Sequence, residues 1–196
     1  MVTDLFVKPD HGARMSPVRE LYIDIDGIRG SVRYPPLRQV LILSRDTIEE
    51  FELSPGDLQE NIIISGIDIH ALRSGTTINI GACHIRLTFH CEPCRKIAHR
   101  VSLAQIAHRR GVLGSFLNKG VICVGDEVVI GQKHFEEIPY NVGERIRWYL
   151  RKCRCPVSVV QLVEDVGLSR SYCRAIPAIV RHTPDIDPNM IIYGAH

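Results

Sequence analysis

The period at which apolar residues recur changes once along this chain of 196 residues, and that change constrains its fold more than any other feature. Before Gly131, apolar residues alternate with polar ones, as at Ile85, Leu87 and Phe89, which is typical of strands with one buried face. After Gly131 they recur at the spacing of an amphipathic helix, as in the set Ile146, Tyr149, Leu150 and Cys153. The sequence therefore predicts a β-rich part and a helical part, divided within residues 131–141.

The β-rich part consists of short apolar segments separated by turns. Ser44 can cap a short helix that runs to Phe51, and the turn Ser54-Pro55-Gly56-Asp57 follows it. Gly125-Asp126 lies between two β-branched runs and predicts a tight turn. Many short strands with few helices favour a barrel over a layered α/β sheet. We therefore expect a mainly β barrel over residues 16–133, preceded by an N-terminal segment of residues 1–15.

The helical part, residues 139–196, is expected to hold three short helices. Gly167 is well placed to end the second of them. Ser169 can cap a third helix, which would continue through Pro177 with a kink, because proline removes a backbone donor. Two helices joined by a tight turn form the helix-turn-helix pattern. The sequence thus predicts a small α-helical domain of the helix-turn-helix kind.

Positive charge is concentrated in the helical part. The whole chain has a net charge of +2, yet residues 139–182 hold eight Lys and Arg against three Asp and Glu. No apolar run approaches the roughly 20 residues that cross a bilayer, and Met1 to Ser16 has no apolar core of a secretion signal. We expect a cytoplasmic protein with no membrane partner, whose seven cysteines are reduced.

The β-rich part carries an ordered set of motifs that resembles the MOSC family, named after the C-terminal domain of molybdenum cofactor sulfurases. The motifs are Gly27-Ile28-Arg29-Gly30, Arg38-Gln39-Val40, Pro55-Gly56-Asp57-Leu58-Gln59-Glu60-Asn61, Gly66-Ile67-Asp68, Gly75…Ile80-Gly81, Pro93-Cys94 and Gly120…Gly125-Asp126-Glu127-Val128. The resemblance implies a β-barrel that binds a molybdenum-pterin cofactor or handles sulfur. Where family members often have Gly-Asp-x-His, this chain has Gly30-Ser31-Val32-Arg33, which lacks both the acid and the imidazole.

In this family the cysteine after the proline is the functional residue, which here is Cys94; it would also be the ligand of molybdenum if the cofactor binds. The thiolate is the reactive form of cysteine, and cations such as the adjacent Arg95 and Lys96 favour it. Side chains that donate hydrogen bonds would bind an anionic ligand such as a phosphate or pterin. The predicted cofactor-binding residues are Arg38, Gln39, Glu60, Asn61, Arg95 and Lys96. The alternative is that Cys94 is only a buried core residue, as free cysteines often are.

Cys91 and Cys94 also form a CxxC pair, which by itself supplies half of a zinc site. The remaining ligands would have to come from Cys153 and Cys155, whose spacing is poor, or from histidines, so we expect no zinc. The same pair could instead be redox-active, with Cys91 resolving an oxidised Cys94.

The helical part resembles the winged-helix DNA-binding domain of alkylguanine-DNA alkyltransferases and alkyltransferase-like proteins. The motifs are Pro156-Val157-Ser158, the run from Gly167 to Ala175, and Ile191-Ile192-Tyr193-Gly194-Ala195-His196. The resemblance implies that Arg174 enters the base stack where a nucleotide is flipped out. Arg170, Arg174 and Arg181 are expected on one helical stripe facing the nucleic acid, together with Tyr172.

Two positions differ from that family. The acceptor cysteine would fall at Gly194-Ala195-His196, where none is present, and Val160 replaces a tyrosine that rotates the nucleotide. We therefore expect no alkyltransferase activity.

The leading interpretation is a MOSC-type thiol protein that binds a molybdopterin-like cofactor or carries sulfur on Cys94, tethered to DNA or structured RNA by a winged helix. The alternative is a non-catalytic, alkyltransferase-like nucleic-acid binder or regulator, with the barrel as a scaffold or ligand sensor. The departure at Gly30-Ser31-Val32-Arg33 favours the alternative, whereas Pro93-Cys94 and Glu60-Asn61 favour the leading interpretation.

Overall fold

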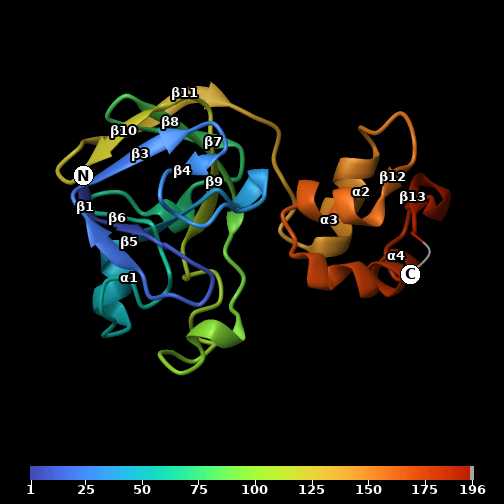
Figure 1. Ribbon diagram of the computed structural model, residues 1–196, viewed down its shortest axis with the longest axis horizontal. Helices are drawn as coiled ribbons and strands as arrows, with labels where there is room; N and C mark the ends of the chain where they lie inside the picture. The colour runs from blue at the N-terminus through green and yellow to red at the C-terminus, as the bar shows by residue number, and fades with distance from the viewer. Residues whose placement is uncertain (195–196) are drawn as a thin grey trace. The chain divides into compact units, whose positions relative to one another are not determined.

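The computed structural model describes residues 1–194 and divides into two compact units (Figure 1). Unit 1 comprises Met1–Tyr34 and Arg38–Glu137, and unit 2 comprises Pro35–Leu37 together with the chain from Ile138 onward. The first residues were expected to precede the barrel as a separate segment. In the structure they form strand β1 (Val2–Val7), which lies inside the main sheet of unit 1.

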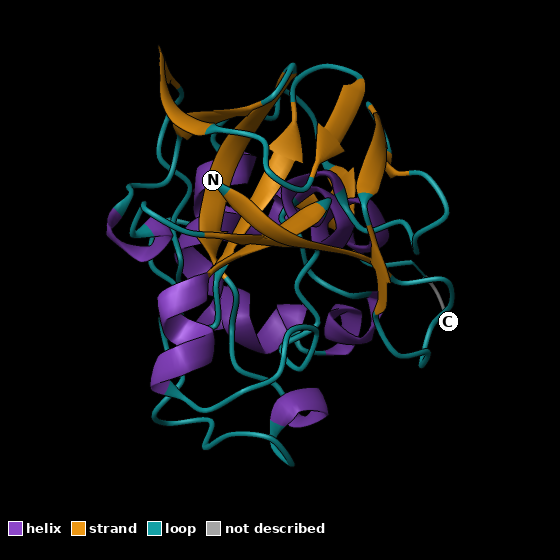
Figure 2. Cartoon of the chain, turned by 90° about the vertical axis from the view of Figure 1, so that its left-hand side faces the viewer, coloured by secondary structure: helices purple, strands orange, loops and turns teal. Residues whose placement is uncertain are grey.

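The main sheet of unit 1 has eight strands in the order β11-β7-β8-β9-β5-β6-β1-β2. Besides β1, these are β2 (Ser16–Val18), β5 (Val40–Ser44), β6 (Ile62–Ile64), β7 (Thr76–Ile80), β8 (Cys83–His90), β9 (Val112–Phe116) and β11 (Val128–His134). β5 and β6 pair in parallel and the other neighbours are antiparallel, so the sheet is mixed. Among the described residues no pairing joins β11 to β2, and the expected barrel is a half-barrel (Figure 2).

A second, three-stranded sheet completes the β structure of unit 1, in the order β10-β3-β4. Its strands are β3 (Glu20–Asp24), β4 (Gly27–Ile28) and β10 (Gly120–Cys123). The tight turn predicted at Gly125-Asp126 is confirmed, since Asp126 N donates to Cys123 O at 3.1 Å and Asp126 Oδ2 accepts from Cys123 N at 2.8 Å. This turn leads from the small sheet to the main sheet.

The predicted helix after β5 is also confirmed. Helix α1 (Arg45–Glu50) is capped by Ser44, whose Oγ accepts from Asp46 N, because that hydroxyl satisfies one of the unpaired amides of the first turn. Short 3-10 helices occur at η1 (Pro36–Arg38), η2 (Ile69–Ala71) and η3 (Arg95–Ile97). The inward faces of the strands form the core, which includes Ile42, Ile62, Ile78, Ile85 and Leu87.

Unit 2 is mainly helical, as expected. Helix α2 (Val142–Leu150) is capped by Asn141, and helix α3 (Val159–Asp165) is capped by Ser158. Gly167 has a φ of +71°, which is the left-handed conformation that ends helices. The short strands β12 (Val157–Ser158) and β13 (Ile191–Ile192) pair in parallel, whereas a wing is a hairpin of antiparallel strands. Ala195 and His196, which close the motif predicted for this region, lie outside the described residues.

The prediction of one continuous third helix after Ser169 is wrong. The chain forms a 3-10 helix, η4 (Arg170–Arg174), followed by helix α4 (Ile176–Arg181) and later η5 (Pro188–Met190). Pro177 lies in the first turn of α4, where its missing N–H would have no helical partner, so it begins a helix here instead of kinking one.

The predicted stripe of arginines is wrong for the same reason. Arg170 and Arg174 belong to η4, and residues four apart do not share a face at three residues per turn. Arg181 belongs to a different helix, α4.

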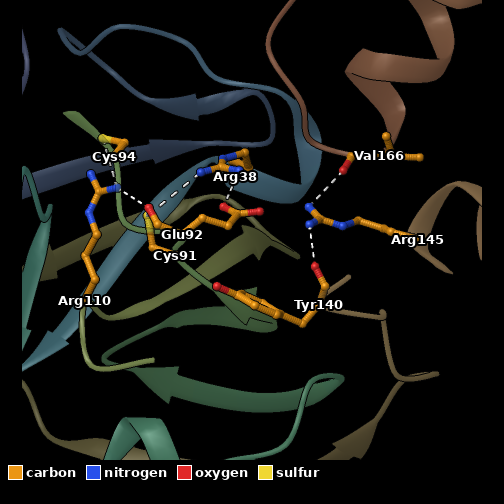
Figure 3. A network of polar contacts seen from close by, with 8 residues as sticks. All are labelled: Arg38, Cys91, Glu92, Cys94, Arg110, Tyr140, Arg145 and Val166. Atoms are coloured by element: carbon orange, nitrogen blue, oxygen red, sulfur yellow. Dashed lines mark hydrogen bonds and ion pairs between the residues drawn. The ribbon is translucent and has the colours of Figure 1, made fainter. Parts of the chain in front are cut away.

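A buried arginine lies inside unit 2. Arg145 of α2 is fully buried, and its guanidinium donates to Val166 O at 3.2 Å and to Tyr140 O at 2.9 Å (Figure 3). The Arg145 side chain therefore connects the end of α3 with the segment before α2.

None of the helices formed by the described residues is long and apolar enough to cross a membrane.

Candidate functional site around Cys94

Cys94 lies at the end of the loop that follows β8 and takes the cap position of η3, with an extended backbone. The pairing of β8 with β9 determines which residues lie beside Cys94. His90 is opposite Val112, and Cys91 N donates to Gly111 O at 2.9 Å, so the next residue, Arg110, is brought to the loop that carries Cys94. Gly111 has a φ of +104°, and a Cβ there would lie 2.6 Å from Ile42 O, so this approach requires glycine.

The guanidinium of Arg110 is the closest cation to the thiol. Its Nη1 lies 3.2 Å from Cys94 Sγ and also donates to Glu92 O (Figure 3). Arg110 is 6% exposed, whereas Cys94 is partly exposed. Arg110 thus donates a charge-assisted hydrogen bond to a sulfur that solvent can reach, a contact that suits the nucleophilic and metal-binding roles of cysteine.

A buried lysine is the second cation of the site. Lys8 follows β1, is 3% exposed, and donates from Nζ to Gln59 Oε1 at 2.8 Å. Burial, together with the charges of Lys96 and Arg110, lowers the pKa of Lys8, while the charge of Cys94 opposes that change. Lys8, Lys96, Arg110 and Cys94 are therefore close enough to interact electrostatically.

The departure from the family motif at Ser31 has a structural role at this point. Ser31 Oγ accepts from Lys8 N at 3.0 Å, and Val32 N donates to Lys8 O at 2.7 Å, so the two residues hold the backbone of Lys8. Arg33 forms an exposed ion pair with Asp26 at 3.5 Å.

Arg38 contacts the other cysteine of the CxxC pair. It forms an ion pair with Glu92 at 2.9 Å, and its Nη2 lies 3.9 Å from Cys91 Sγ (Figure 3). Burial raises the pKa of the Cys91 thiol, against the opposing effect of the Arg110 and Arg38 guanidiniums. Each sulfur of the pair thus has a guanidinium beside it.

Three of the predicted cofactor-binding residues instead hold backbone. Gln39 donates to Ile25 O and accepts from Phe116 N, both at 2.7 Å. Asn61 accepts from Leu41 N at 3.1 Å and donates to Phe6 O at 3.3 Å.

Glu60 is fully buried and accepts from Gly56 N at 2.5 Å and from Leu58 N at 3.1 Å. Burial raises its pKa to about 7, although these hydrogen bonds oppose the shift. Together with Asn61 and Gln59, it fixes the loop that supports Lys8.

The remaining predicted residues, Arg95 and Lys96, are exposed on η3 directly after Cys94. Sequence reasoning missed Lys8 and Arg110. A signal for Lys8 was present in the run Val2–Val7, which has the composition of a strand, but those residues were assigned to a separate segment. Arg110 had no local signal, because only the register of β8 and β9 brings it to Cys94.

Among the described residues no group of three or more His, Cys, Asp and Glu side chains is arranged to hold a metal ion. In unit 2, Tyr172, Arg174 and Arg181 are exposed. Arg170 is exposed as well but forms an ion pair with Glu164, with Nη2 to Oε1 at 2.7 Å.

The half-barrel with a cysteine at the exit of β8 defines a known class of protein. Residues 30–129 match the model of the MOSC domain, which is half of the chain, and the protein belongs to the MOSC family.

Solved structures share the fold over different parts of the chain. The crystal structure of YiiM from Escherichia coli has a TM-score of 0.54 and 19% identity, and the match covers 98% of each chain. YiiM from Geobacillus stearothermophilus has a TM-score of 0.56 and 15% identity, over 91% of this chain and 97% of its own. The YUAD protein from Bacillus subtilis has a TM-score of 0.56 and 16% identity, over 69% of this chain and 98% of its own. A search of curated proteins gave no match.

The YiiM likeness extends over nearly all of the chain, so unit 2 has a counterpart in that fold.

Proposed function

We propose that the protein is a MOSC-type thiol protein in which Cys94 carries sulfur as a persulfide or ligates the molybdenum of a pterin cofactor. The observation that carries this proposal is the contact of 3.2 Å between Arg110 Nη1 and Cys94 Sγ. A guanidinium in this position stabilises a thiolate, and it would equally stabilise the anionic outer sulfur of a persulfide.

The charges around the thiol support an anionic ligand. Lys8 interacts with Lys96 and with Arg110, and within the described residues none of the three forms an ion pair with a carboxylate. Burying a cation without an anion is costly, so an anion that enters this site would relieve part of that cost. A phosphate-bearing pterin has the required charge.

The donor set fits the cofactor in its chemistry, because a thiolate is a ligand for molybdenum and cations bind phosphate. Cys94 would bind the metal, and Lys8, Lys96 and Arg110 would bind the anionic part. When bound, the cofactor supplies two-electron redox chemistry at its metal. The polar groups of Gln39, Glu60 and Asn61 are engaged with backbone and would act by holding the loops in place.

Sulfur carriage is tested by mass spectrometry of the purified full chain after treatment with sodium polysulfide. We expect one additional sulfur atom on Cys94 directly after the treatment, and none there in Cys94→Ala. A chain in which other cysteines take up sulfur while Cys94 remains a thiol would contradict sulfur carriage. Metal and pterin analysis of protein expressed with molybdate tests the cofactor arm, again with Cys94→Ala as the control. Failure of both arms would leave unit 1 as a scaffold or ligand sensor.

A second proposed activity is binding of DNA or structured RNA by unit 2. The observation in its favour is that Arg174 and Arg181 are exposed and, among the described residues, form no ion pair. Tyr172, 42% exposed, lies on the same 3-10 helix as Arg174 and offers a ring on which a base can stack.

This second activity is tested by titrating the full chain against labelled duplex and hairpin at several salt concentrations. Each phosphate contact contributes a log–log slope of about −0.9 on B-DNA, so Arg174→Ala and Arg181→Ala should each reduce the slope by about one. Arg170→Ala is the matched control, because its charge is already paired with Glu164. An absence of binding below about 100 μM at low salt would rule the activity out.

A further inference from the structure

The two cysteines of the CxxC motif are linked through a single pair of polar atoms (Figure 3). Cys91 Sγ lies 4.0 Å from Glu92 O, and that oxygen also accepts from Arg110 Nη1. The same Nη1 lies 3.2 Å from Cys94 Sγ. Both sulfurs are free thiols, and a negative charge on Cys94 raises the pKa of Cys91. One carbonyl oxygen and one guanidinium nitrogen thus connect the two sulfurs, since each sulfur lies within 4.0 Å of one of these two atoms.

The two thiols differ in their exposure to solvent. This difference suits a pair in which one thiol reacts with outside molecules and the other reacts with its neighbour. Cys94 is partly exposed and can react with a molecule from solution, whereas Cys91 is 3% exposed and lies behind it. A buried thiol is protected from external reagents but remains available to a neighbouring sulfur. Arg38, 3.9 Å from Cys91 Sγ, supplies a positive charge when that thiol loses its proton.

We propose that Cys91 is the resolving thiol of this site, which releases sulfur from a Cys94 persulfide by forming a Cys91–Cys94 disulfide. This inference rests on the proposed sulfur carriage by Cys94 and deepens it. It assigns a function to Cys91 and identifies the sulfur species that leaves Cys94 as hydrosulfide.

The step balances in atoms and electrons. Cys91 loses its proton, and its sulfur attacks Sγ of the Cys94 persulfide, so a bond forms between the two cysteine sulfurs. The bond from Cys94 Sγ to the outer sulfur breaks, and hydrosulfide leaves with the electron pair and takes up the proton. The outer sulfur is reduced to sulfide while Cys91 is oxidised to a disulfide sulfur. A dithiol reductant then returns both cysteines to thiols by two exchange reactions.

The sequence makes this step easy to follow. Trypsin cuts after Arg86 and Arg95, so the peptide Leu87–Arg95 contains Cys91 and Cys94 and no other cysteine. A disulfide within this peptide shows as the loss of two hydrogens, and a persulfide shows as the gain of one sulfur.

The experiment treats the reduced full chain with sodium polysulfide, removes the excess, and measures both this peptide and the sulfide released. In the wild type we expect a persulfide on Cys94 directly after the treatment, which is then replaced by the Cys91–Cys94 disulfide as free sulfide is released. In Cys91→Ala we expect the persulfide to persist on Cys94 and sulfide release to fall by about tenfold or more. Cys83→Ala, which removes a buried cysteine of β8 outside the pair, should behave like the wild type.

A parallel arm uses diamide, which oxidises thiol pairs without any persulfide. A Cys91–Cys94 disulfide with diamide, but no sulfur on Cys94 with polysulfide even in Cys91→Ala, would support the pair and contradict sulfur carriage. Persulfide on Cys94 in the wild type that persists as long as in Cys91→Ala would contradict the resolving role and leave sulfur carriage standing. Diamide-treated wild type in which Cys91 stays a thiol would overturn the proposed pair.

Cys91→Ala removes only one buried sulfur atom, so we expect this variant to fold. Circular dichroism and the melting temperature check that it does.

Discussion

Arg110 and Cys94 are sixteen positions apart in the chain, yet the guanidinium of one lies 3.2 Å from the sulfur of the other. The contact exists because the antiparallel pairing of β8 and β9 ends with Cys91 opposite Gly111. The chemistry available to Cys94 is therefore a property of the fold and not of its neighbours in the sequence alone.

Replacing Arg110 with Met should slow the alkylation of Cys94 by iodoacetamide at pH 7 by about tenfold, because the charge that favours the thiolate is removed. The measurement is time-resolved peptide mapping of the native protein. Arg109→Met is the matched control, since that neighbouring side chain instead forms an ion pair with Glu50. Equal Cys94 rates in Arg110→Met and the wild type, with both proteins folded, would show that Arg110 does not activate the thiol.

Lys8→Met should reduce the affinity of unit 1 for anions. Phosphate that binds only the folded state stabilises it by about 2.7 kcal/mol at a hundred times its Kd, so the wild type should melt at higher temperature as phosphate is added. We expect Lys8→Met to lose at least half of that increase. The exposed Lys133, replaced by Met, should keep all of it. Parallel curves for the wild type and Lys8→Met would place phosphate binding elsewhere.

Glu60 should make the stability of unit 1 depend on pH. Its folded-state pKa is raised to about 7 from an ordinary 4.5, so ionisation is more costly in the folded protein. Its stabilising contribution is complete below about pH 4.5 and is lost as the pH rises to about 7, by about 3 kcal/mol at most. Glu60→Gln removes this dependence, so the free energy of unfolding of the wild type relative to Glu60→Gln should decrease over this range.

Urea unfolding of both proteins at several pH values measures that difference. Glu49→Gln, which changes an exposed carboxylate of α1, is the control and should show no comparable trend. A difference between the wild type and Glu60→Gln that stays constant from pH 4.5 to 8 would contradict the shifted ionisation of Glu60.

Arg145→Met should destabilise unit 2 selectively. The change leaves the buried carbonyl oxygen of Val166 and the partly buried one of Tyr140 without a charged donor, which should cost about 2–4 kcal/mol. Hydrogen exchange of the full chain should therefore speed up in α2 and α3 and remain unchanged in β7 and β8. Arg151→Met, at an exposed position next to α2, is the control. Equal acceleration in both units, or none in either, would be inconsistent with this role for Arg145.

Local signals in the sequence predicted local structure well. Ser44 begins a helix, Gly125-Asp126 forms a turn, and the alternation at Ile85, Leu87 and Phe89 marks a buried strand, since each of these depends on a few adjacent residues. The family motifs identified a MOSC domain and pointed to Cys94.

What could not be predicted depends on contacts between distant residues. Lys8 reaches the site because β1 is inserted between β2 and β6, and Arg110 reaches it through strand register. The break between η4 and α4 was missed because Pro177 is compatible both with a kinked helix and with the first turn of a new one. Gln39 and Asn61 lie in motifs, and only the fold shows that their amides hold backbone.

The place of β1 in the sheet also sets the order in which the protein can assemble during synthesis. Val2 pairs with Ile64, so this edge of β1 stays without its partner until about sixty more residues have been synthesised, which takes roughly 3–12 seconds at ordinary rates of translation. Lys8 and Cys94 cannot be brought together with Arg110 until a larger share of the chain has left the ribosome. In a cell, this edge of β1 is consequently open to chaperones and to aggregation during that time, and Cys94 emerges before Arg110, which lies beside it in the fold.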